Sequence, residues 1–523
     1  MAAVASASST QVAIIQDNSD LTNPTGALQQ FRVLGANTVR LIIPWSLVAP
    51  DSNSPKKPNF DATDPNAYPS SNWIPYDSVV QQAEAEGITV DLTVSGGAPR
   101  WADGPGIPRG GTNPYYAWKP SASDYGQFVQ AVATRYDGRF TPRLQSGPLP
   151  AVHFWTIFNE PNFGEDLGPQ AINGSSVSVG PMMYRGLVDA AWKALQVTGH
   201  RGDTILIGEF AARGTDGRPS RHAPQGYPGN YGQTKPLEFI RTLYCVDSQY
   251  NELRGGYASA RGCPTTAGGS RSFRRQHPGL FDASGVGDHP YPDNLSPVAD
   301  GRGDPNFAAF PDLGNLARTL DQVNIVYRSP TRYPIYNDEY GYITHPPARS
   351  HYVSGATAAY YINWAEYLSW KNPRVKSYMQ YLLTDPPSSS GAYAGFASGL
   401  ETPSGKPKAT YDAYRMPLYM PQTSFSHSQS VEIWGDVRPA PLTAGDGAGP
   451  QAAQIQLQTG HGAFKTLEAV KLTGPGGYFD VEMKFPSSGT VRLRWTYPAQ
   501  DAFLPTNVLG TTISSRTFSV KVR

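Results

Sequence analysis

The sequence predicts an α/β protein, a closed (β/α)₈ TIM barrel followed by a smaller all-β domain. Two observations favour this fold. From about residue 11 to 415, short β-type runs alternate with longer helical patterns, and beyond about residue 421 short runs alternate apolar and polar residues. Continuous apolar runs between helices are typical of buried parallel strands, whereas a period of two is typical of antiparallel sheets with one wet face.

Eight apolar runs supply the strands of the expected barrel. They span 12–15, 38–43, 88–94, 152–158, 204–207, 285–289, 335–339 and 377–383. Helical patterns between them cover 29–34, 76–86, 123–136, 182–197 and 356–370. An open nucleotide-binding sheet would carry a glycine-rich turn after its first strand, but residues 16–20 read Gln-Asp-Asn-Ser-Asp. A closed barrel is therefore favoured.

We place the domain boundary at residue 420, so that 1–420 form the barrel and 421–523 the all-β domain. Period-two runs in this second part are separated by turn segments such as Gly474-Pro-Gly-Gly. The runs span 431–434, 453–458, 479–485, 491–495 and 518–522. Short strands at such close spacing predict an immunoglobulin-like β-sandwich.

Charge and hydropathy exclude two kinds of partner. The 523 residues carry a net charge of +1, which gives no electrostatic reason to expect nucleic acid or an anionic membrane. No apolar run approaches the length of a membrane span. Aromatic residues reach 11%, with 30 Tyr and 10 Trp, and such rings serve both for core packing and for stacking against sugar faces.

The two cysteines, Cys245 and Cys263, have no metal-type spacing and no nearby pair of histidines. A local disulfide is favoured over two free thiols, and it would suit an oxidising compartment. The first residues, Met-Ala-Ala-Val-Ala, have neither a positive nor an apolar signal region and read as a trimmed mature N-terminus. We therefore expect a secreted protein.

Two glutamates stand at the carboxyl ends of expected barrel strands, where barrels of this kind carry their active sites. Glu160 follows a run of Phe, Trp, Ile and Phe, and Glu339 ends the seventh strand. Burial beside apolar residues favours a protonated carboxyl, as a general acid requires. A strand-end Glu also serves in ion pairs or anchors loops. The pair together indicates glycosidic cleavage through an oxocarbenium-like state.

Several motifs together resemble clan A of the glycoside hydrolases, the "4/7" barrels, and within it family 39 or the cellulase-like family 5. They are Asn159-Glu160-Pro161, Glu339 in Glu-Tyr-Gly, Gly35-Ala-Asn-Thr-Val-Arg40, His289-Pro-Tyr291 and Tyr411-Asp-Ala-Tyr414. The resemblance covers the architecture of about residues 10–415 and a few dozen specific positions.

This resemblance implies a retaining hydrolase that works by double displacement. Glu160 would be the acid/base, and Glu339 the nucleophile that forms a covalent glycosyl-enzyme. Asn159 would bind the sugar 2-hydroxyl, whose bond tightens in the transition state. Arg40 and Tyr291 would keep Glu339 ionised and aimed. We expect Glu160 to keep its proton at a pH where Glu339 is charged.

The remaining site residues are less specific. His289 would contact sugar or support the neighbouring Tyr, although a structural histidine fits equally well. Many clan members carry a Trp platform at the end of the eighth strand, which this sequence lacks. Candidate platforms are Tyr381, Trp364, Trp45 and Trp101, and buried loop anchors are an equal alternative for the last two.

Other interpretations remain beside this one. Asp338 adjoins Glu339, but neighbouring strand residues face opposite ways, so only one lines the mouth. Glu209, in Ile-Gly-Glu-Phe, is the rival nucleophile. A metal-dependent barrel would need a His-x-His pair, and none of the nine His forms one, so no metal or organic cofactor is expected.

Two further activities fit the same barrel. A transglycosylase would share every step except the acceptor, and a non-catalytic sugar-binding barrel would be expected to lack one of the two Glu. The expected partner is an oligosaccharide, polysaccharide or other glycoside. Its identity would depend on the loops at 103–118 and 214–232.

Overall fold

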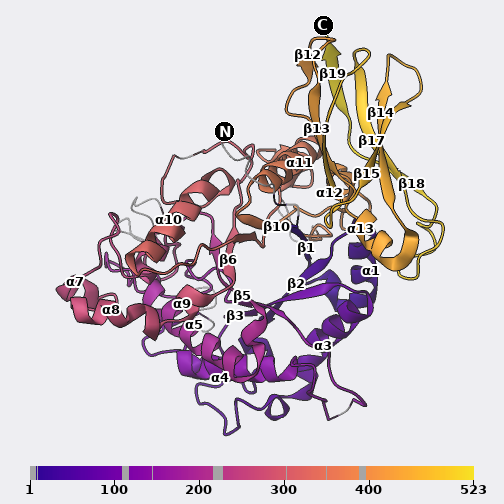
Figure 1. Ribbon diagram of the computed structural model, residues 1–523. Coiled ribbons are helices and arrows are strands. Elements are labelled where there is room, and N and C mark those ends of the chain that lie inside the picture. The colour runs from indigo at the N-terminus through magenta and orange to yellow at the C-terminus, as the bar shows by residue number, and fades with distance from the viewer. Residues whose placement is uncertain are drawn as a thin grey trace.

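The computed structural model describes residues 8, 10–108, 117–143, 145–215, 228–301, 303–348, 350–387 and 396–523. Eight parallel strands close into a barrel in the order β1-β10-β7-β6-β5-β4-β3-β2 (Figure 1). They are β1 (Val12–Gln16), β2 (Thr38–Pro44), β3 (Thr89–Ser95), β4 (Phe154–Ile157), β5 (Thr204–Ala211), β6 (Gly285–His289), β7 (Ile335–Asn337) and β10 (Val375–Tyr381). The predicted closed barrel is confirmed.

Helices follow the strands and cover the outside of the barrel (Figure 1). The longer ones are α1 (Pro24–Leu34), α3 (Ser70–Ala85), α4 (Ala122–Arg135), α5 (Gly180–Val197), α6 (Pro236–Leu243), α8 (Ala267–Gln276), α10 (Leu313–Val326), α11 (Gly355–Lys371) and α12 (Ala409–Arg415). The shorter ones are α2 (Trp45–Val48), α7 (Gly255–Ser259), α9 (Gly279–Asp282) and α13 (Ala440–Thr443). In the described part of the chain, no helix is long and apolar enough to cross a membrane.

The C-terminal part consists mainly of β-sheets, as predicted, with the short helix α13 among them. One sheet holds β11 (Leu418–Tyr419), β13 (Val431–Asp436) and β16 (Tyr478–Met483). The larger sheet holds β12 (Ser424–Phe425), β19 (Phe518–Val522), β17 (Gly489–Thr496), β14 (Gln451–Gln458) and β15 (Lys465–Leu472), with β18 (Thr512–Ser514) paired to β17. A two-stranded sheet, β8 (Thr344–His345) with β9 (Val353–Ser354), lies in the loop after β7.

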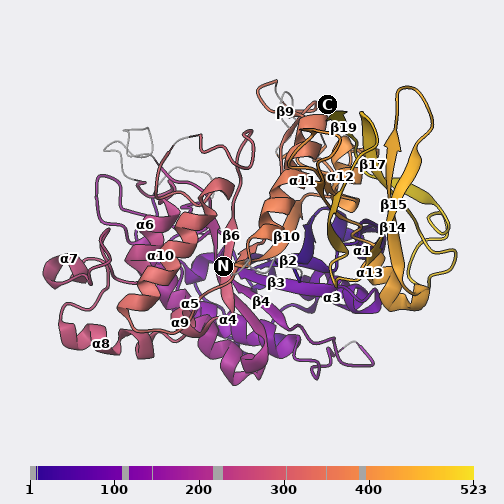
Figure 2. The ribbon, with the colours of Figure 1, turned by 45° about the horizontal axis from the view of Figure 1, so that its top comes forward.

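These sheets pack beside α1, α11 and α12 (Figure 2). Gly35, which ends α1, shows how close the approach is. It has a φ of 83°, and a Cβ there would lie 2.3 Å from the carbonyl carbon of Arg438. Only glycine adopts this left-handed conformation without cost and leaves that space.

A buried ion pair crosses the same contact. Arg438 donates two hydrogen bonds of 2.7 Å to the carboxylate of Glu366 on α11, and the Tyr478 hydroxyl donates a third of 3.1 Å. The carboxylate of Asp436 lies 3.6 Å from the guanidinium and accepts no hydrogen bond from the described residues. Both carboxylates therefore depend on one arginine for their compensating charge.

We expect Arg438→Ala to lower the free energy of unfolding by about 3–5 kcal/mol, because it leaves two buried carboxyl groups without a cation. Urea denaturation measures the change. Arg332→Ala is the matched control, because Arg332 is 73% exposed and lies 3.6 Å from Asp321. That control is expected to cost about 1 kcal/mol or less. Equal costs in the two variants would contradict the role given to Arg438.

The predicted disulfide is present between Cys245 and Cys263, and it joins the segment after α6 to the end of the turn after α7. The immunoglobulin-like arrangement of the sheets and the boundary at residue 420 stay predictions.

Candidate active site

A cavity of about 590 Å³ opens at the carboxyl ends of the barrel strands. Glu160, Glu339 and Tyr291 lie in its wall. The other lining residues are Phe163, Ala211, Ala212, Arg213, Gln233, Asp293, Asn294, Gly341, Ile343, His351, Tyr352 and Phe396. The two glutamates that the sequence singled out thus face one space.

Glu160 stands on a strained turn directly after β4. Phe158 and Glu160 both have left-handed backbone, with φ of 75° and 37°, which is uncommon for residues other than glycine and concentrates at functional sites. The Glu160 side chain is 19% exposed. Burial raises its pKa to about 7, with nearby Arg40 opposing the rise and Glu209 adding to it. A carboxyl that holds its proton near neutral pH is suited to general acid catalysis.

Glu339 follows β7 and receives two strong donors. The hydroxyl of Tyr291 donates to its Oε1 at 2.8 Å, and Nη1 of Arg40 donates to its Oε2 at 2.9 Å. Its side chain is 15% exposed. A phenol and a guanidinium that donate to the same carboxylate hold it in one orientation. This is the environment that a nucleophilic carboxylate needs.

His289, the last residue of β6, lies between the two glutamates. Its Nδ1 is 2.9 Å from Oε1 of Glu160 and 3.7 Å from Oε2 of Glu339. These two carboxylate oxygens are consequently less than about 7 Å apart. Burial lowers the pKa of His289, so the ring is neutral at pH 7. A neutral ring carries one N–H, on either Nδ1 or Nε2, and that nitrogen can donate a hydrogen bond to the group it faces.

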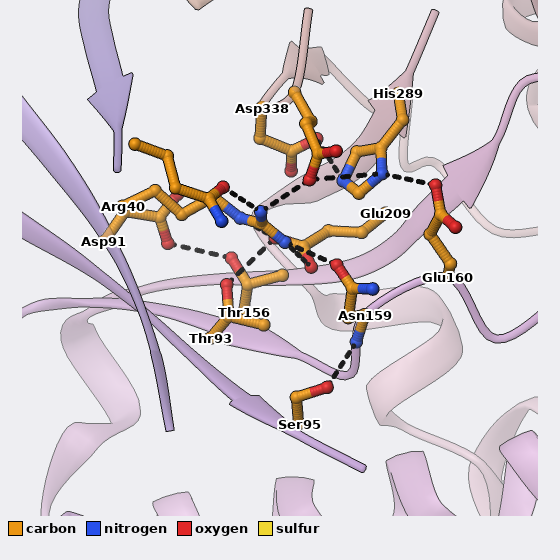
Figure 3. A network of polar contacts seen from close by, with 12 residues as sticks. Arg40, Asp91, Thr93, Ser95, Thr156, Asn159, Glu160, Glu209, His289 and Asp338 are labelled. Carbon is orange, nitrogen blue, oxygen red and sulfur yellow. Dashed lines mark hydrogen bonds and ion pairs between the residues drawn. The ribbon is translucent and has the colours of Figure 1, made fainter. Parts of the chain in front are cut away.

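Arg40 on β2 lies at the centre of the network beneath the cavity (Figure 3). Its guanidinium is fully buried and uses all five of its N–H donors. Nε and Nη2 donate to the two oxygens of Glu209, and Nη2 also donates to Oδ1 of Asn159 at 2.8 Å. Nη1 donates to Glu339 and to Gln16. The arginine therefore cannot swing toward a ligand without breaking several bonds.

Asn159 precedes Glu160 in the chain, and its side chain is already bonded within the protein. Besides accepting from Arg40, its amide donates to Oδ1 of Asp166 at 3.2 Å. The pKa of Asp166 is raised well above its usual range by burial and by the charge of Glu160. Asp166 was not predicted, although its position seven residues after Asn159, in the loop after β4, is where site residues occur. The 2-hydroxyl contact of Asn159 stays a prediction.

Asp338 faces away from the cavity, as the alternation of neighbouring strand residues predicts. Its Oδ1 accepts a hydrogen bond of 3.0 Å from the backbone N–H of Asp288. Burial, followed by the charge of Glu209, raises its pKa well above the usual range. A Cβ on Gly287 would lie 2.2 Å from Oδ2 of Asp338, so this glycine leaves the space that the buried acid occupies.

Two predicted platforms require correction. Trp45 is 1% exposed and stacks on Phe128 with ring centroids 5.8 Å apart. Trp101 lies edge-on to it at 5.7 Å and donates its indole N–H to the Pro50 carbonyl. Neither lines the cavity. Both are buried loop anchors, because the aromatic residues of α4 and the preceding loops enclose them.

The other two platform candidates differ from each other. Trp364 packs on Tyr419 of the C-terminal sheets, with ring centroids 5.9 Å apart, and so belongs to that contact. Tyr381 ends β10, and its ring lies edge-on to Phe396, which lines the cavity. The role of Tyr381 as a platform stays a prediction.

Some cavity residues were not predicted. Arg213, two residues after β5, pairs with Asp293 beyond β6, and both line the cavity. Both residues follow the ends of barrel strands, and this position could have identified them as candidate site residues from the sequence. Residues 109–116 and 216–227, within the loops expected to set substrate identity, lie outside the described residues.

Among the described residues, Glu209, His289 and Asp338 have ligand atoms within 4.8 Å of one another, close enough to hold a metal ion. The carboxylate of Glu209 is already bound by Arg40 and by the hydroxyl of Thr93. Because a guanidinium already supplies the cation here, the group is an ion-pair network as it stands.

The chain matches no protein-family model and no curated protein. Solved structures to which it is similar include barrel glycoside hydrolases. One is a family 39 glycoside hydrolase from the gut symbiont Bacteroides cellulosilyticus WH2, with 14% identity, 92% of this chain and 80% of that chain covered, and a TM-score of 0.46. Another is a family 1 β-glucosidase from Thermotoga maritima, with 14% identity, coverages of 76% and 85%, and a TM-score of 0.43. The functional case therefore rests on the site itself.

Proposed function

We propose that this protein is a retaining glycoside hydrolase of the clan A type, with Glu160 as acid/base and Glu339 as nucleophile. The observation that carries the proposal is the contrast between two carboxyl groups at one cavity. Burial raises the pKa of Glu160 to about 7, whereas Glu339 accepts hydrogen bonds from the guanidinium of Arg40 and the hydroxyl of Tyr291. Pairs of acids whose surroundings push them in opposite directions mark acid and base roles.

The proposed reaction has two displacements. In the first, Glu339 forms a bond to the anomeric carbon while the glycosidic C–O bond breaks, and Glu160 gives its proton to the leaving oxygen. In the second, Glu160 removes a proton from water as the water oxygen attacks the same carbon, and the bond to Glu339 breaks. Tyr291 and Arg40 orient Glu339 toward the anomeric carbon, and they donate hydrogen bonds to its carboxylate again once it is released.

The spacing of the carboxylates favours retention of configuration. Retaining enzymes hold the two groups about 5–5.5 Å apart, and inverting enzymes hold them about 6.5–9.5 Å apart to admit a water. The contacts of His289 limit the distance between one oxygen of Glu160 and one oxygen of Glu339 to less than about 7 Å. This limit includes the retaining range and reaches only the lower edge of the inverting range.

A panel of aryl glycosides tests the activity and names the sugar. Glucoside, xyloside, galactoside, glucuronide and α-L-arabinofuranoside are incubated with the wild type and with the double variant Glu160→Ala/Glu339→Ala. We expect release of the phenol from at least one by the wild type and none by the double variant. Sugar binding without any turnover, seen by calorimetry, would favour a non-catalytic barrel instead. Transfer to an added sugar in place of water would identify a transglycosylase.

The pH dependence follows from Glu160. Its proton must be present for the first displacement, and its pKa is raised to about 7. We expect kcat/KM for a substrate with a poor leaving group to fall as pH rises through about 7. A profile that stays flat from pH 5 to about 9 on such a substrate would contradict the role of Glu160.

Two further expectations are proposals of the same kind. The disulfide between Cys245 and Cys263 supports action outside the reducing cytosol. The two C-terminal sheets share one apolar core, which supports an immunoglobulin-like sandwich over 421–523 as an accessory to the barrel.

A further inference from the structure

Glu209 is a buried carboxylate within the site that neither displacement uses. It is fully buried on β5 and receives three hydrogen bonds, two from Arg40 and one of 3.0 Å from the hydroxyl of Thr93. Figure 3 shows its carboxylate beside the guanidinium of Arg40. It does not line the cavity, whereas Glu339 does.

The backbone at Glu209 is shaped to bring the side chain to this place. Glu209 has a φ of 51°, and the pairing of β5 with β6 shifts register between Gly208 and Phe210. Such a bulge re-aims one side chain relative to the regular alternation of a strand. A Cβ on Gly287, opposite in β6, would lie 2.9 Å from Cγ of Glu209. The left-handed backbone serves this one carboxylate, and the space left by Gly287 is shared between Glu209 and Asp338.

The charges explain what the carboxylate does there. Arg40 donates to Glu339 at 2.9 Å, and its charge lowers the pKa of Glu160 against the rise that burial causes. Glu209 is paired side-on with that guanidinium, so the two form a nearly neutral unit. Without Glu209, the full charge of Arg40 would act on both catalytic carboxyls.

We propose that Glu209 is a positioning residue that holds Arg40 and offsets its charge, so that Glu160 keeps a proton beside a cation. The inference rests on the proposed function for its catalytic consequence, but its electrostatic part stands without it. Arg40 then acts on Glu339 chiefly as an aimed hydrogen-bond donor. The backbone carbonyl of Glu209 also accepts the N–H of Glu160 at 3.1 Å, which ties the two residues together.

Several other groups face Glu160 and are kept in every variant of the test. They are His289, Tyr291, Glu339, Asp166, Asp288 and Tyr381. Burial lowers the pKa of His289 and raises that of Asp288 well above its usual range, so burial favours the neutral form of both. A change in the titration of Glu160 after a substitution at Glu209 therefore reports the lost charge.

The test measures the pKa of Glu160 by ¹³C NMR of carboxyl-labelled glutamate in the whole chain, with Glu160→Gln to assign the signal. Glu209→Gln should lower this pKa by roughly one unit, because it removes a nearby negative charge. The pH at which kcat/KM falls on the basic side of the profile should decrease by the same amount. Glu165→Gln, which removes the charge of an exposed residue in the loop after β4, should move neither.

Two further variants separate charge from placement. Glu209→Asp keeps the charge but shortens its reach to Arg40, so it should lower kcat and leave the basic limb near its native pH. The double variant Arg40→Met/Glu209→Gln removes both charges, so the pKa of Glu160 should stay near its native value. If Glu209→Gln alone does not fold, this double variant provides the test instead.

The outcomes distinguish the two claims. An unmoved Glu160 signal and an unmoved basic limb in Glu209→Gln would overturn the role of Glu209 while the glycosidase stands. A shifted signal in a protein that cleaves no glycoside would uphold the electrostatic role and count against the proposed function.

Discussion

Glu339→Ala is expected to lose about 10⁴-fold or more in kcat on every substrate that the wild type cleaves, because the group that forms the covalent bond is gone. The cavity left by the side chain lies at the anomeric carbon. Added azide should therefore restore turnover and give a glycosyl azide of inverted configuration. The product anomer is read by ¹H NMR.

Asn294→Ala is the control for this variant, because Asn294 lines the same cavity and, among the described residues, its side chain donates to the His351 carbonyl and forms no hydrogen bond with Glu160 or Glu339. It should keep kcat within about 10-fold of the wild type. A Glu339→Ala enzyme that turns over at a comparable rate would show that another carboxylate is the nucleophile, and Glu209 would be the next to replace.

Glu160→Ala is expected to show a loss that depends on the leaving group. On substrates with poor leaving groups, the loss of the general acid should cost about 10²–10⁴-fold, whereas activated aryl glycosides need little protonation in the first step. Azide should restore the second step and give a product of retained configuration. The basic limb near pH 7 should also disappear, because the group that titrates there is absent.

A series of aryl glycosides with increasing phenol acidity measures this effect. In the variant, log kcat/KM should depend steeply on the acidity of the phenol, and in the wild type only weakly. An equal loss across the series would mean that Glu160 does not protonate the leaving oxygen.

The barrel could be predicted from the sequence because its strands are buried on both sides and read as continuous apolar runs. Helices were harder. α6 has only eight residues, too short for its pattern to stand out from a loop. α10 buries Leu313, Leu316, Leu320 and Val323. This spacing is typical of a helix and is visible in the sequence, but the predicted helices did not include this segment.

The meeting of Glu160 and Glu339 at one mouth was predictable because parallel barrel strands end on the same side. The role of Glu209 was not. The fifth strand was expected to end at residue 207, whereas β5 continues to Ala211 through a bulge. A bulge breaks the alternation that sequence patterns rely on, so the direction of the side chain cannot be read from the residues alone.

The tryptophans show a different limit. Trp45 and Trp101 follow strand ends, where sugar platforms occur, but so do the anchors of long loops. What decides between these roles is the aromatic surface that α4 brings beside them, including Phe128. The contact between Trp45 and Phe128 joins residues more than eighty positions apart, so no local sequence pattern predicts it.

The covalent intermediate gives the most direct test of the two-carboxylate mechanism. The wild type is incubated with a 2-deoxy-2-fluoroglycoside of the best substrate sugar, which slows release of the intermediate, and the labelled peptide is sequenced by mass spectrometry. We expect the sugar on Glu339 and no label in Glu339→Gln. A label on Glu160 or Glu209, or turnover with no label on any carboxylate, would contradict the assignment.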